Sequence, residues 1–456
     1  MAENQEKNEL MEKIISLAKR RGFIYQGSEI YGGLSGTWDW GPLGVALKNN
    51  VKNLWWRMFV EEREDMYGVD AAILMNAKVW EASGHVAGFS DPLVECVKCK
   101  RRFRADHIEG DKCPECGGKL GESRQFNMMF KTAIGAMEDS AATSYLRPET
   151  AQGIFVNFKN IIDSFHPKLP FGIGQIGKAF RNEITPRDFI FRVRELEQME
   201  VEYFVHPAEW EKYFEMWKNI MWKWIEAIGI DKKNVHEHEI KDGERAHYSK
   251  RTIDFEFDYP FGRKELYGLA YRTDYDLRKH SEHSGVALDY VEEAPTPEGV
   301  GVPTKSVGKK FTPHVIEPSL GVDRTILAIL LDAYSEDELG EGTRVFLKLK
   351  PSIAPVKVAV FPLLKNKPEL VKKAREIFER IKKEIPQTMW DDNGNVGKRY
   401  RRQDEIGTPF CITVDFDTLG ENIELKDTVT LRNRDSGKQE RVEIEKLTKI
   451  LKSAIL

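Results

Sequence analysis

The stretch that decides the fold runs from Lys178 to Val205 and reads KAFRNEITPRDFIFRVRELEQMEVEYFV. Two alternating arms flank a turn at 185–188, which predicts a long antiparallel hairpin. One face of the second arm collects the apolar side chains Val193, Met199, Val201, Tyr203 and Val205. The other face collects Arg192, Arg194, Glu200 and Glu202, and the first arm adds Arg181 and Glu183. The hairpin is therefore either a solvated sheet face with paired charges or a platform for a ligand with an anionic and a cationic part.

The composition is that of a globular chain. Of its 456 residues 41% are hydrophobic and 31% are charged, so we expect roughly three domains of ~150 residues. Leu10, Ile14 and Leu17 recur at helical spacing between charged residues, which predicts an amphipathic surface helix and neither a signal peptide nor a membrane span. We therefore expect a cytoplasmic protein without a membrane partner. The net charge of -4 gives no sign of bulk affinity for nucleic acid, so any RNA contact must come from local basic patches.

Four of the five cysteines form two CxxC pairs separated by 13 residues. The pairs are Cys96 with Cys99 and Cys113 with Cys116. In a chain without an export signal, this spacing favours metal over disulfides. Four thiolates satisfy tetrahedral zinc and leave no open position, so the sequence predicts a structural zinc site; the alternative is four unligated thiols. The arginines that lie between the pairs, Arg101, Arg102 and Arg104, read as a solvated charge run, although they can also contact RNA.

Helices and strands are predicted on both sides of the hairpin. A glycine-rich, aromatic segment over 23–42 leads into a helix over 43–59 that Pro42 opens. Its apolar stripe, which includes Val51, Trp55 and Phe59, is explained by burial in the core. Further elements are a helix over 208–230 that ends near Gly229, strands over 252–258 and 265–270, and a helix over 326–334 that follows the strand and turn 315–325.

The chain beyond residue 354 reads as a separate domain. A linker with Pro351 and Pro355 precedes a strand over 357–361, a helix over 368–384, a strand over 409–414, a strand pair near 428–442 and a final helix. Alternating strands and helices predict a small α/β unit. The basic segment 397–402 includes Tyr400, whose ring can stack on an unpaired base.

These motifs, in this order, resemble those of class II aminoacyl-tRNA synthetases. The Phe-Arg-x-Glu, turn and Arg layout of the hairpin resembles motif 2, and segment 189–195 is similar to its version in homodimeric glycyl-tRNA synthetases. Segment 42–59 resembles motif 1, whose helix lies at the dimer interface in the family, and segment 315–325 resembles motif 3. Segments 147–153 and 268–277 resemble parts of the glycyl enzymes, and segment 402–409 resembles the anticodon-binding domain of class IIa synthetases. The resemblance covers nearly the whole chain.

The resemblance implies an α+β fold in which helices flank the antiparallel sheet of a class II synthetase. It implies a catalytic domain over 1–354 and an α/β anticodon-binding domain over 355–456. The catalytic domain would contain a zinc-ribbon insertion at about 93–120 and an insertion of a helix and strands at about 207–250. The resemblance also implies a homodimer.

The implied activity is the ATP-dependent ligation of glycine to tRNA(Gly) through a glycyl-adenylate, with Mg²⁺ and structural Zn²⁺ as cofactors. The implied catalytic residues are Arg181 for the α-phosphate and the substrate carboxylate, Glu183 for the adenine amino group and Arg324 for the γ-phosphate. The implied ATP-binding residues are Arg181, Asn182, Glu183, Phe191, Arg192, Val193, Glu265, Leu266 and Arg324. The implied metal ligands are Cys96, Cys99, Cys113 and Cys116.

The implied glycine-binding residues are Glu149, Glu200, Glu317 and Ser319. Three converging carboxylates repel one another, so we expect at least one raised pKa and a strongly negative pocket for the substrate ammonium. One position departs from the family pattern. Leu196 stands where class II enzymes commonly place an aromatic residue that stacks on adenine, so stacking would be weaker or would pass to another residue such as Phe191.

Two other functions are compatible with the sequence. The first is a catalytically silent class II relative that serves as a nucleic-acid-binding accessory subunit. The joint presence of Arg181, Glu183, Arg324 and the three glutamates argues against it. The second is a synthetase for another small amino acid, such as serine, threonine or proline.

Overall fold

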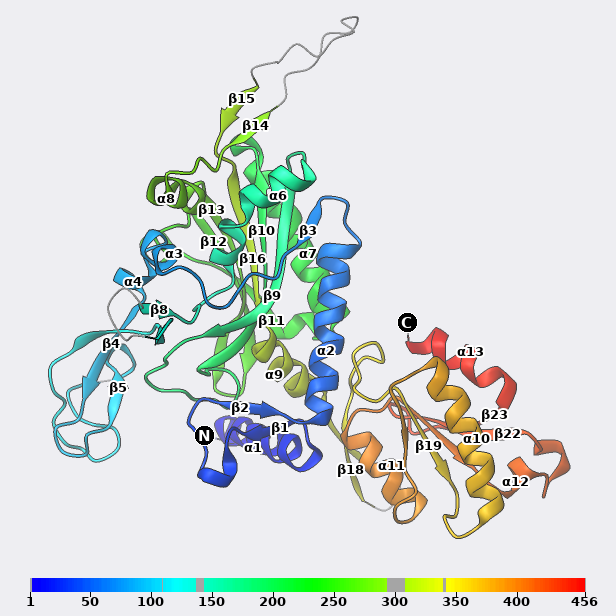
Figure 1. The fold of residues 1–456 in the computed structure, drawn as a ribbon. Coiled ribbons are helices and arrows are strands. Elements are labelled where there is room, and N and C mark those ends of the chain that lie inside the picture. The colour runs from blue at the N-terminus through cyan, green and yellow to red at the C-terminus, as the bar shows by residue number, and fades with distance from the viewer. Residues whose placement is uncertain (1, 109, 137–142, 293–307, 339–341, 456) are drawn as a thin grey trace, which may run out of the picture.

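The computed structural model describes residues 2–108, 110–136, 143–292, 308–338 and 342–455. Its centre is a seven-stranded sheet in the order β11-β12-β13-β16-β10-β9-β3 (Figure 1). The strands are β11 (Val235–Glu239), β12 (Arg251–Tyr259), β13 (Gly262–Thr273), β16 (His314–Gly321), β10 (Glu195–Val205), β9 (Phe171–Phe180) and β3 (Met66–Gly68). Neighbouring strands are antiparallel except β3 and β9, which are parallel. The expected antiparallel sheet with helices around it is confirmed.

The hairpin β9–β10 is present, but its arms end earlier than the sequence predicted. Pairing runs from Phe171 opposite Phe204 to Phe180 opposite Glu195, so residues 181–194 form a long loop. Some loop amides bond within the loop, as between Arg187 and Arg192, and others bond to distant segments. The Arg194 N–H donates to the carbonyl of Gly36 at 2.7 Å, and the Asn182 N–H donates to that of Met128 at 2.7 Å. The prediction of extended strands through Glu183 and from Phe191 onward was therefore wrong.

Alternation along β10 separates the core from the opposite face of the sheet. Met199, Val201, Tyr203 and Val205 are buried in the main hydrophobic core, as expected. The helices packed on this side are α2 (Pro42–Trp56), α7 (Trp210–Ala227) and α9 (Val322–Ala333) (Figure 1). A fully buried side chain of this size stabilises the fold by about 1.5–3 kcal/mol. The other face of β10 presents Gln198, Glu200 and Glu202, which are free of that core and available for chemistry.

The predicted helices are present with shifted bounds. Pro42 is the first residue of α2, which continues as a π-helix over Arg57–Glu61, and Val51, Trp55 and Phe59 are fully buried. Gly229 has φ 85° just beyond α7, as the predicted cap requires. Helix α9 begins at Val322, directly after β16, whereas the sequence prediction began it at residue 326. Arg324 therefore lies within the first turn of α9.

The elements of segment 207–250 are part of the central layers. Helix α7 packs in the main core, and β11 is the edge strand of the sheet. The helices α5 (Ala151–Phe155), α6 (Phe158–Phe165) and α8 (Tyr275–Ser284) and the hairpin β14–β15 (Tyr290–Glu292, Lys309–Phe311) occupy the other side and one end. At the N-terminal end lie α1 (Ala2–Arg21), β1 (Ile24–Gln26) and β2 (Trp38–Trp40) (Figure 1).

A small three-stranded sheet projects beside the central one. Its order is β5-β4-β6, with β4 (Ser90–Glu95), β5 (Arg102–Arg104) and β6 (Arg124–Asn127). The short helices α3 (Ala77–Ala82) and α4 (His85–Gly88) precede it, and β7–β8 (Lys131–Ala133, Thr143–Tyr145) follow it. This projection contains all four paired cysteines at the expected place in the chain.

The C-terminal part forms a second core around a five-stranded sheet in the order β20-β19-β21-β22-β23. The strands are β19 (Val358–Pro362), β20 (Thr388–Trp390), β21 (Phe410–Val414), β22 (Thr428–Asn433) and β23 (Gln439–Glu443). The helices are α10 (Pro368–Glu384), α11 (Val396–Glu405), α12 (Phe416–Leu419) and α13 (Ile444–Ile455). Val356 packs in the first core and Val358 in the second, which supports the proposed boundary near residue 355.

The junction between the two parts is polar and partly buried. The hairpin β17–β18 (Tyr334–Glu338, Thr343–Leu347) follows α9 and contacts α11. Arg344 on β18 is buried beside Asp404 on α11, and Arg432 on β22 binds both oxygens of Asp404 at 2.7 and 2.9 Å. The second domain is thus anchored to the segment that follows α9.

Tyr400 is in contact with other residues of its own domain. Its ring packs against Phe361, and its hydroxyl bonds to Thr413 Oγ1 at 2.6 Å. These contacts explain the ring by packing within the domain, and the base-stacking role stays a prediction. Among the described helices, none has the length and apolarity of a membrane span.

Candidate active site

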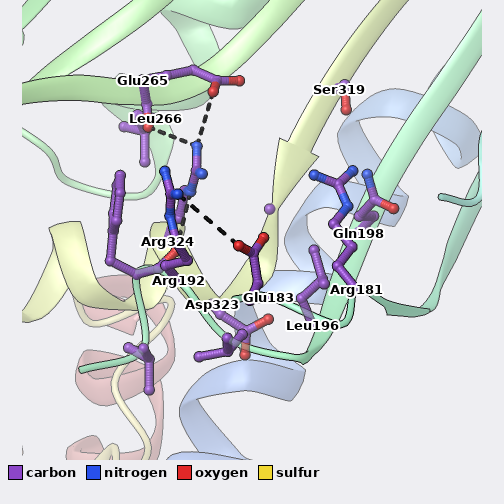
Figure 2. A pocket seen from close by; sticks show the side chains of 14 residues that line it. Arg181, Glu183, Arg192, Leu196, Gln198, Glu265, Leu266, Ser319, Asp323 and Arg324 are labelled. Carbon is purple, nitrogen blue, oxygen red and sulfur yellow. Dashed lines mark hydrogen bonds and ion pairs between the residues drawn. The ribbon is translucent and has the colours of Figure 1, made fainter. Parts of the chain in front are cut away.

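A pocket of about 130 Å³, open to solvent, lies at the end of the central sheet between the 181–194 loop and the start of α9 (Figure 2). Its lining includes Arg181, Glu183, Ile190, Phe191, Arg192, Val193, Leu196, Gln198, Glu265, Leu266, Ser319, Gly321, Asp323 and Arg324. The two arginines from distant motifs, Arg181 and Arg324, thus line one pocket. Of the expected ATP-binding residues only Asn182 is not part of this lining.

Arg181 is held from two sides. Its Nε donates to the carbonyl of Pro148 at 3.0 Å, and its guanidinium lies over the ring of Phe89, 5.5 Å from the centroid. These contacts leave the outer nitrogens of the guanidinium fork to face the pocket, beside Gln198 (Figure 2). A guanidinium fork of this kind suits bidentate binding of phosphate or carboxylate.

Arg324 faces the same pocket from the first turn of α9. Its Nη1 donates to the carbonyl and to Oε2 of Glu265, each at 3.0 Å, and its guanidinium lies 4.3 Å from the ring centroid of Phe191. The free N–H groups of the helix start add to its positive field. The ring of Phe191, which lies next to Tyr259 and Phe261, gives the pocket an aromatic wall where Leu196 gives none.

Glu183 lies between Arg181 and Arg324 in Figure 2. Its Oε2 is 4.0 Å from Nη1 of Arg192. Among the described residues its buried Oε2 has no hydrogen-bond partner. Burial raises the pKa of Glu183 despite the neighbouring Arg192 and Arg181. A buried oxygen without a partner at a pocket wall is available to a ligand donor such as an amino group.

None of the three expected glycine-site glutamates lines this pocket, but Glu200 adjoins it through Gln198 and Ser319. Glu200 accepts from Ser319 Oγ at 2.7 Å and from Gln198 Nε2 at 2.8 Å, and also from Thr150. Glu149 accepts from Gln152 Nε2 at 2.9 Å and lies 3.2 Å from the Nε2 of His85. Glu149, Glu200 and Glu317 interact electrostatically with one another, so they form one cluster.

The sheet register explains how the cluster forms. Glu200 on β10 pairs with Gln175 on β9 and with Ser319 on β16, and Ser319 in turn pairs with Gly268 on β13. These four residues make a row on one face of the sheet because paired residues point to the same side. Glu317 lies one step further along that face, opposite Ala270.

A buried cation that the sequence analysis missed lies within this acidic cluster. Arg272 on β13 binds Asp276 through two bonds of 2.8 and 2.9 Å and Glu317 through one of 2.8 Å. Its guanidinium lies 3.7 Å from the ring centroid of Tyr248. No local pattern pointed to this role, since Arg272 lies beyond the predicted strand 265–270 and its partner Glu317 comes from another strand. Arg272 therefore neutralises part of the strongly negative pocket that the sequence predicted.

The carboxyl groups of the cluster titrate differently. Burial raises the pKa of Glu200, and burial with the neighbouring carboxylates raises the pKa of Glu317 to about 8 in spite of Arg272. Burial opposes ionisation of Glu149 as well, but His85, Arg272 and Gln152 hold its pKa well below the usual range. Glu202, which lies on the same face, is fully buried, and its pKa is raised well above normal by burial and by Glu317. The expectation of at least one raised pKa agrees with these directions.

The four cysteines fit a tetrahedral metal. Their sulfur atoms lie within 4.8 Å of one another, with Cys96 and Cys116 at 3.5 Å and Cys99 and Cys113 at 3.7 Å. Four sulfurs around Zn²⁺ at 2.3 Å stand ~3.8 Å apart, so the spacing suits zinc. All four are free thiols in this structure. None of the four cysteines lines the pocket, and four thiolates leave no open position, which suits a structural rather than a catalytic metal.

Comparison with known proteins places the chain in a family. Residues 130–333 match the family of tRNA synthetase class II core domains (G, H, P, S and T), and residues 357–454 match that of anticodon binding domains. The chain is 48% identical to a glycine–tRNA ligase of Caldanaerobacter subterraneus and 50% identical to one of Clostridium acetobutylicum, over 98% of each chain. It is 48% identical to the enzyme of that name from Treponema denticola, over 98% of this chain and 97% of the relative. The chain therefore belongs to the glycine–tRNA ligases, a family of class II aminoacyl-tRNA synthetases.

Proposed function

We propose that this protein activates glycine with ATP and transfers it to tRNA(Gly). The observation that carries the proposal is that Arg181 and Arg324 line one pocket, whose Ser319 and Gln198 also bind the acidic cluster. A triphosphate site and an ammonium site thus share a wall. The relatives named glycine–tRNA ligase support glycine as the amino acid and tRNA as the acceptor.

The first step is an in-line attack of the glycine carboxylate on the α-phosphorus. Positioning and charge neutralisation dominate such a step because the two anions repel each other. Arg181 is suited to hold both anions, since its Nε is engaged by Pro148 and its outer nitrogens face the pocket. Arg324 is suited to hold the γ-phosphate in exchange for its bond to Glu265.

The base of ATP would lie against Phe191. Glu183 would accept from the adenine amino group through its unpartnered Oε2. The aromatic wall of Phe191 would take over the stacking that Leu196 cannot supply. The Arg324 guanidinium now covers this ring at 4.3 Å, so it would move away from the ring to admit the base. The lining positions of Arg192, Val193 and Leu266 are compatible with the same site.

Glycine would bind between Ser319 and the carboxylates Glu149, Glu200 and Glu317. Its ammonium compensates the charge that Arg272 leaves uncompensated. Selectivity would come from size, because a pocket that has no room for a methyl group rejects every larger amino acid. Gly268 lies in the same row as Ser319 and Glu200 and has no side chain, which leaves space beside these two residues.

Two metals complete the proposal. Mg²⁺ accompanies the triphosphate and reduces its negative charge. The carboxylates that fit this ion are Glu265, which lines the pocket, and its neighbours Asp254 and Glu256. Burial and repulsion by Glu265 and Glu256 raise the pKa of Asp254 to about 7. Zn²⁺ would be held by Cys96, Cys99, Cys113 and Cys116 and would stabilise the projecting sheet.

A homodimer formed near α2 has support in exposed apolar residues. Ile30 is 89% exposed, Tyr31 87% and Leu34 56%, and the strands that flank this loop pair beside α2. Large apolar side chains rarely stand in water without a partner. The resemblance of α2 to the motif 1 helix makes a second copy the expected partner.

The four reduced thiols suit the cytoplasm.

Glycine-dependent ATP–pyrophosphate exchange tests the proposal. Exchange is expected with glycine and is expected to be much slower with alanine, serine, threonine or proline. Arg181→Ala should abolish exchange while the far-UV circular dichroism remains unchanged. A catalytically silent accessory subunit would give no exchange with any amino acid, and a synthetase of another specificity would give exchange with another one.

A further inference from the structure

His85 touches a glycine-site carboxylate from outside the catalytic sheet. It is the first residue of α4, and its Nε2 lies 3.2 Å from Oε2 of Glu149. Both side chains are about nine-tenths buried, with exposures of 10% and 12%. The other ring nitrogen, Nδ1, lies 2.7 Å from the hydroxyl of Ser83. With Ser83 as the partner of Nδ1, Nε2 is the ring nitrogen that forms the ion pair with Glu149.

The backbone of His85 is fixed in turn by Asn127, the last residue of β6. The amide Nδ2 of Asn127 donates to the carbonyls of His85 at 3.2 Å and Val86 at 2.9 Å, and its Oδ1 accepts from the N–H of Met129 at 2.9 Å. Asn127 also pairs with Ser90 at the base of the projecting sheet. Asn127 therefore connects α4 to β6 through its side chain and β6 to β4 through strand pairing.

We call residues 85–91 and 124–129 the ribbon stem. The stem touches the nucleotide side of the pocket as well, through Phe89 under Arg181 and through the carbonyl of Met128, which accepts from the Asn182 N–H at 2.7 Å. The contact of His85 is the one that reaches the acidic cluster. Its effect can thus be separated from contacts that concern ATP.

We propose that His85 is a positioning residue for glycine binding: it holds the Glu149 carboxylate in place, and Asn127 holds His85. Glu149 has donors on two of its sides, His85 on Oε2 and Gln152 on Oε1. With both oxygens fixed by elements outside β10 and β16, the carboxylate faces the ammonium site in one orientation. This inference rests on the proposed placement of the glycine ammonium beside Glu149.

The test compares the KM values for glycine and ATP in pyrophosphate exchange. His85→Ala should raise the KM for glycine by about tenfold or more, the effect of losing a charge-assisted hydrogen bond, and leave the KM for ATP within about twofold. His85→Gln, whose amide can donate from the position of Nε2, should recover most of the loss. His236→Ala is the matched control, because His236 makes a similar contact of 2.7 Å with Asp258 on the exposed edge strand β11.

A double-mutant cycle with Glu149→Gln separates this inference from the proposed site. If Glu149→Gln leaves the KM for glycine unchanged, the proposed glycine site is wrong. If Glu149→Gln raises that KM and His85→Ala does not, the site stands and the role of His85 is refuted. In the expected result the double variant is no worse than Glu149→Gln alone. Equal increases in both KM values for His85→Ala, or no recovery in His85→Gln, would also overturn the inference.

Discussion

The Nη1 of Arg272 donates to Oε1 of Glu317 at 2.8 Å inside the acidic cluster, so this cluster contains a buried cation of its own. The arrangement differs from a simple negative hole. Arg272 uses three of its five N–H groups on Asp276 and Glu317. An incoming ammonium therefore adds a second positive charge to a group of carboxyls of which Glu200, Glu202 and Glu317 have raised pKa values.

Glycine binding should improve as the pH rises towards 8. The raised pKa of Glu317, about 8, means that this carboxyl holds a proton at neutral pH in the free enzyme. An ammonium favours the ionised form, so binding should release a proton at pH 7 and the KM for glycine should fall from pH 6 to pH 8. Calorimetry in buffers of different ionisation enthalpy measures the release; proton uptake would contradict this prediction.

The same carboxyls should make the free enzyme less stable at higher pH. A carboxyl with a pKa raised above its unfolded value binds more protons in the folded state, so the stability it contributes is present below about pH 4.5 and is lost as the pH rises through about 8. Saturating glycine should reduce this loss, since it stabilises the ionised form. Thermal unfolding between pH 6 and 8, with and without glycine, measures both effects.

Arg272→Met should destabilise the folded protein by about 3–5 kcal/mol, because it leaves the buried Asp276 carboxylate without its counter-charge. The variant keeps the length of the side chain and its contact with Tyr248, so the loss reports the charge. Arg278→Met on the exposed side of α8 is the control and should change stability by less than about 0.5 kcal/mol. Urea unfolding followed by tryptophan fluorescence compares the two, and equal stabilities would show that the carboxyls are protonated instead.

Gly268→Ala should weaken glycine binding without affecting the fold. An added Cβ at this position would meet no atom closer than Glu265 Oε1 at 3.9 Å, so the protein itself has room for it. The methyl group would project from the row that holds Ser319 and Glu200, into the space proposed for glycine. The KM for glycine should rise at least tenfold, by an order-of-magnitude estimate for one methyl clash. Gly397→Ala on α11 serves as a control in open surroundings, and an unchanged KM in both variants would move the glycine site elsewhere.

Removal of zinc should act on the projecting sheet first and on glycine binding second. A chelator should increase amide exchange in residues 90–127, since four thiolates no longer fix the turns around them. Because the ribbon stem carries Asn127 and His85, the KM for glycine should then rise in a preparation whose central sheet is still protected. Hydrogen exchange read by mass spectrometry gives the first result. A metal-free preparation with unchanged exchange and activity would count against a required zinc.

Asp404→Asn should loosen the attachment of the C-terminal domain. Asp404 lies between Arg344 and Arg432, and the three side chains are at most 3% exposed. The change leaves Arg432 with a neutral partner at this site and Arg344 with its other carboxylate, Asp337, alone. We expect faster amide exchange in β17–β18 and α11 and slower tRNA charging, with little effect on pyrophosphate exchange.

Asp435→Asn, at an exposed position, is the control. Charging at the full rate with a loosened junction would show that domain docking does not limit the reaction.

The sequence was sufficient to predict elements whose pattern is local. The period of β10 gave the correct core residues, Pro42 gave the start of α2, and the CxxC spacing gave the cysteine cluster. The bounds of the hairpin could not be predicted, because backbone N–H groups at both ends of the 181–194 loop donate to the carbonyls of Gly36 and Met128, which are distant in the chain. The role of Arg272 was missed for a similar reason, since its partner Glu317 comes from a strand 45 residues away.

Side chains with charge were harder to assign than apolar ones. Tyr400 and the arginines around it suggested an RNA surface, yet Arg399 is 1% exposed and bonds to backbone carbonyls of its own domain. Composition alone does not distinguish a basic residue that binds a partner from one that caps carbonyls. The distinction needs the loop geometry between β20 and α11, which no local pattern in that segment specifies.

Helix α9 connects the pocket to the hairpin at the junction with the second domain. It begins at the pocket, where Arg324 occupies its first turn, and ends at the hairpin that docks against α11. Twelve residues of helix span about 18 Å as a stiff rod. If a molecule bound to the second domain displaced the β17–β18 hairpin, α9 would transmit this displacement to the guanidinium of Arg324 at its other end.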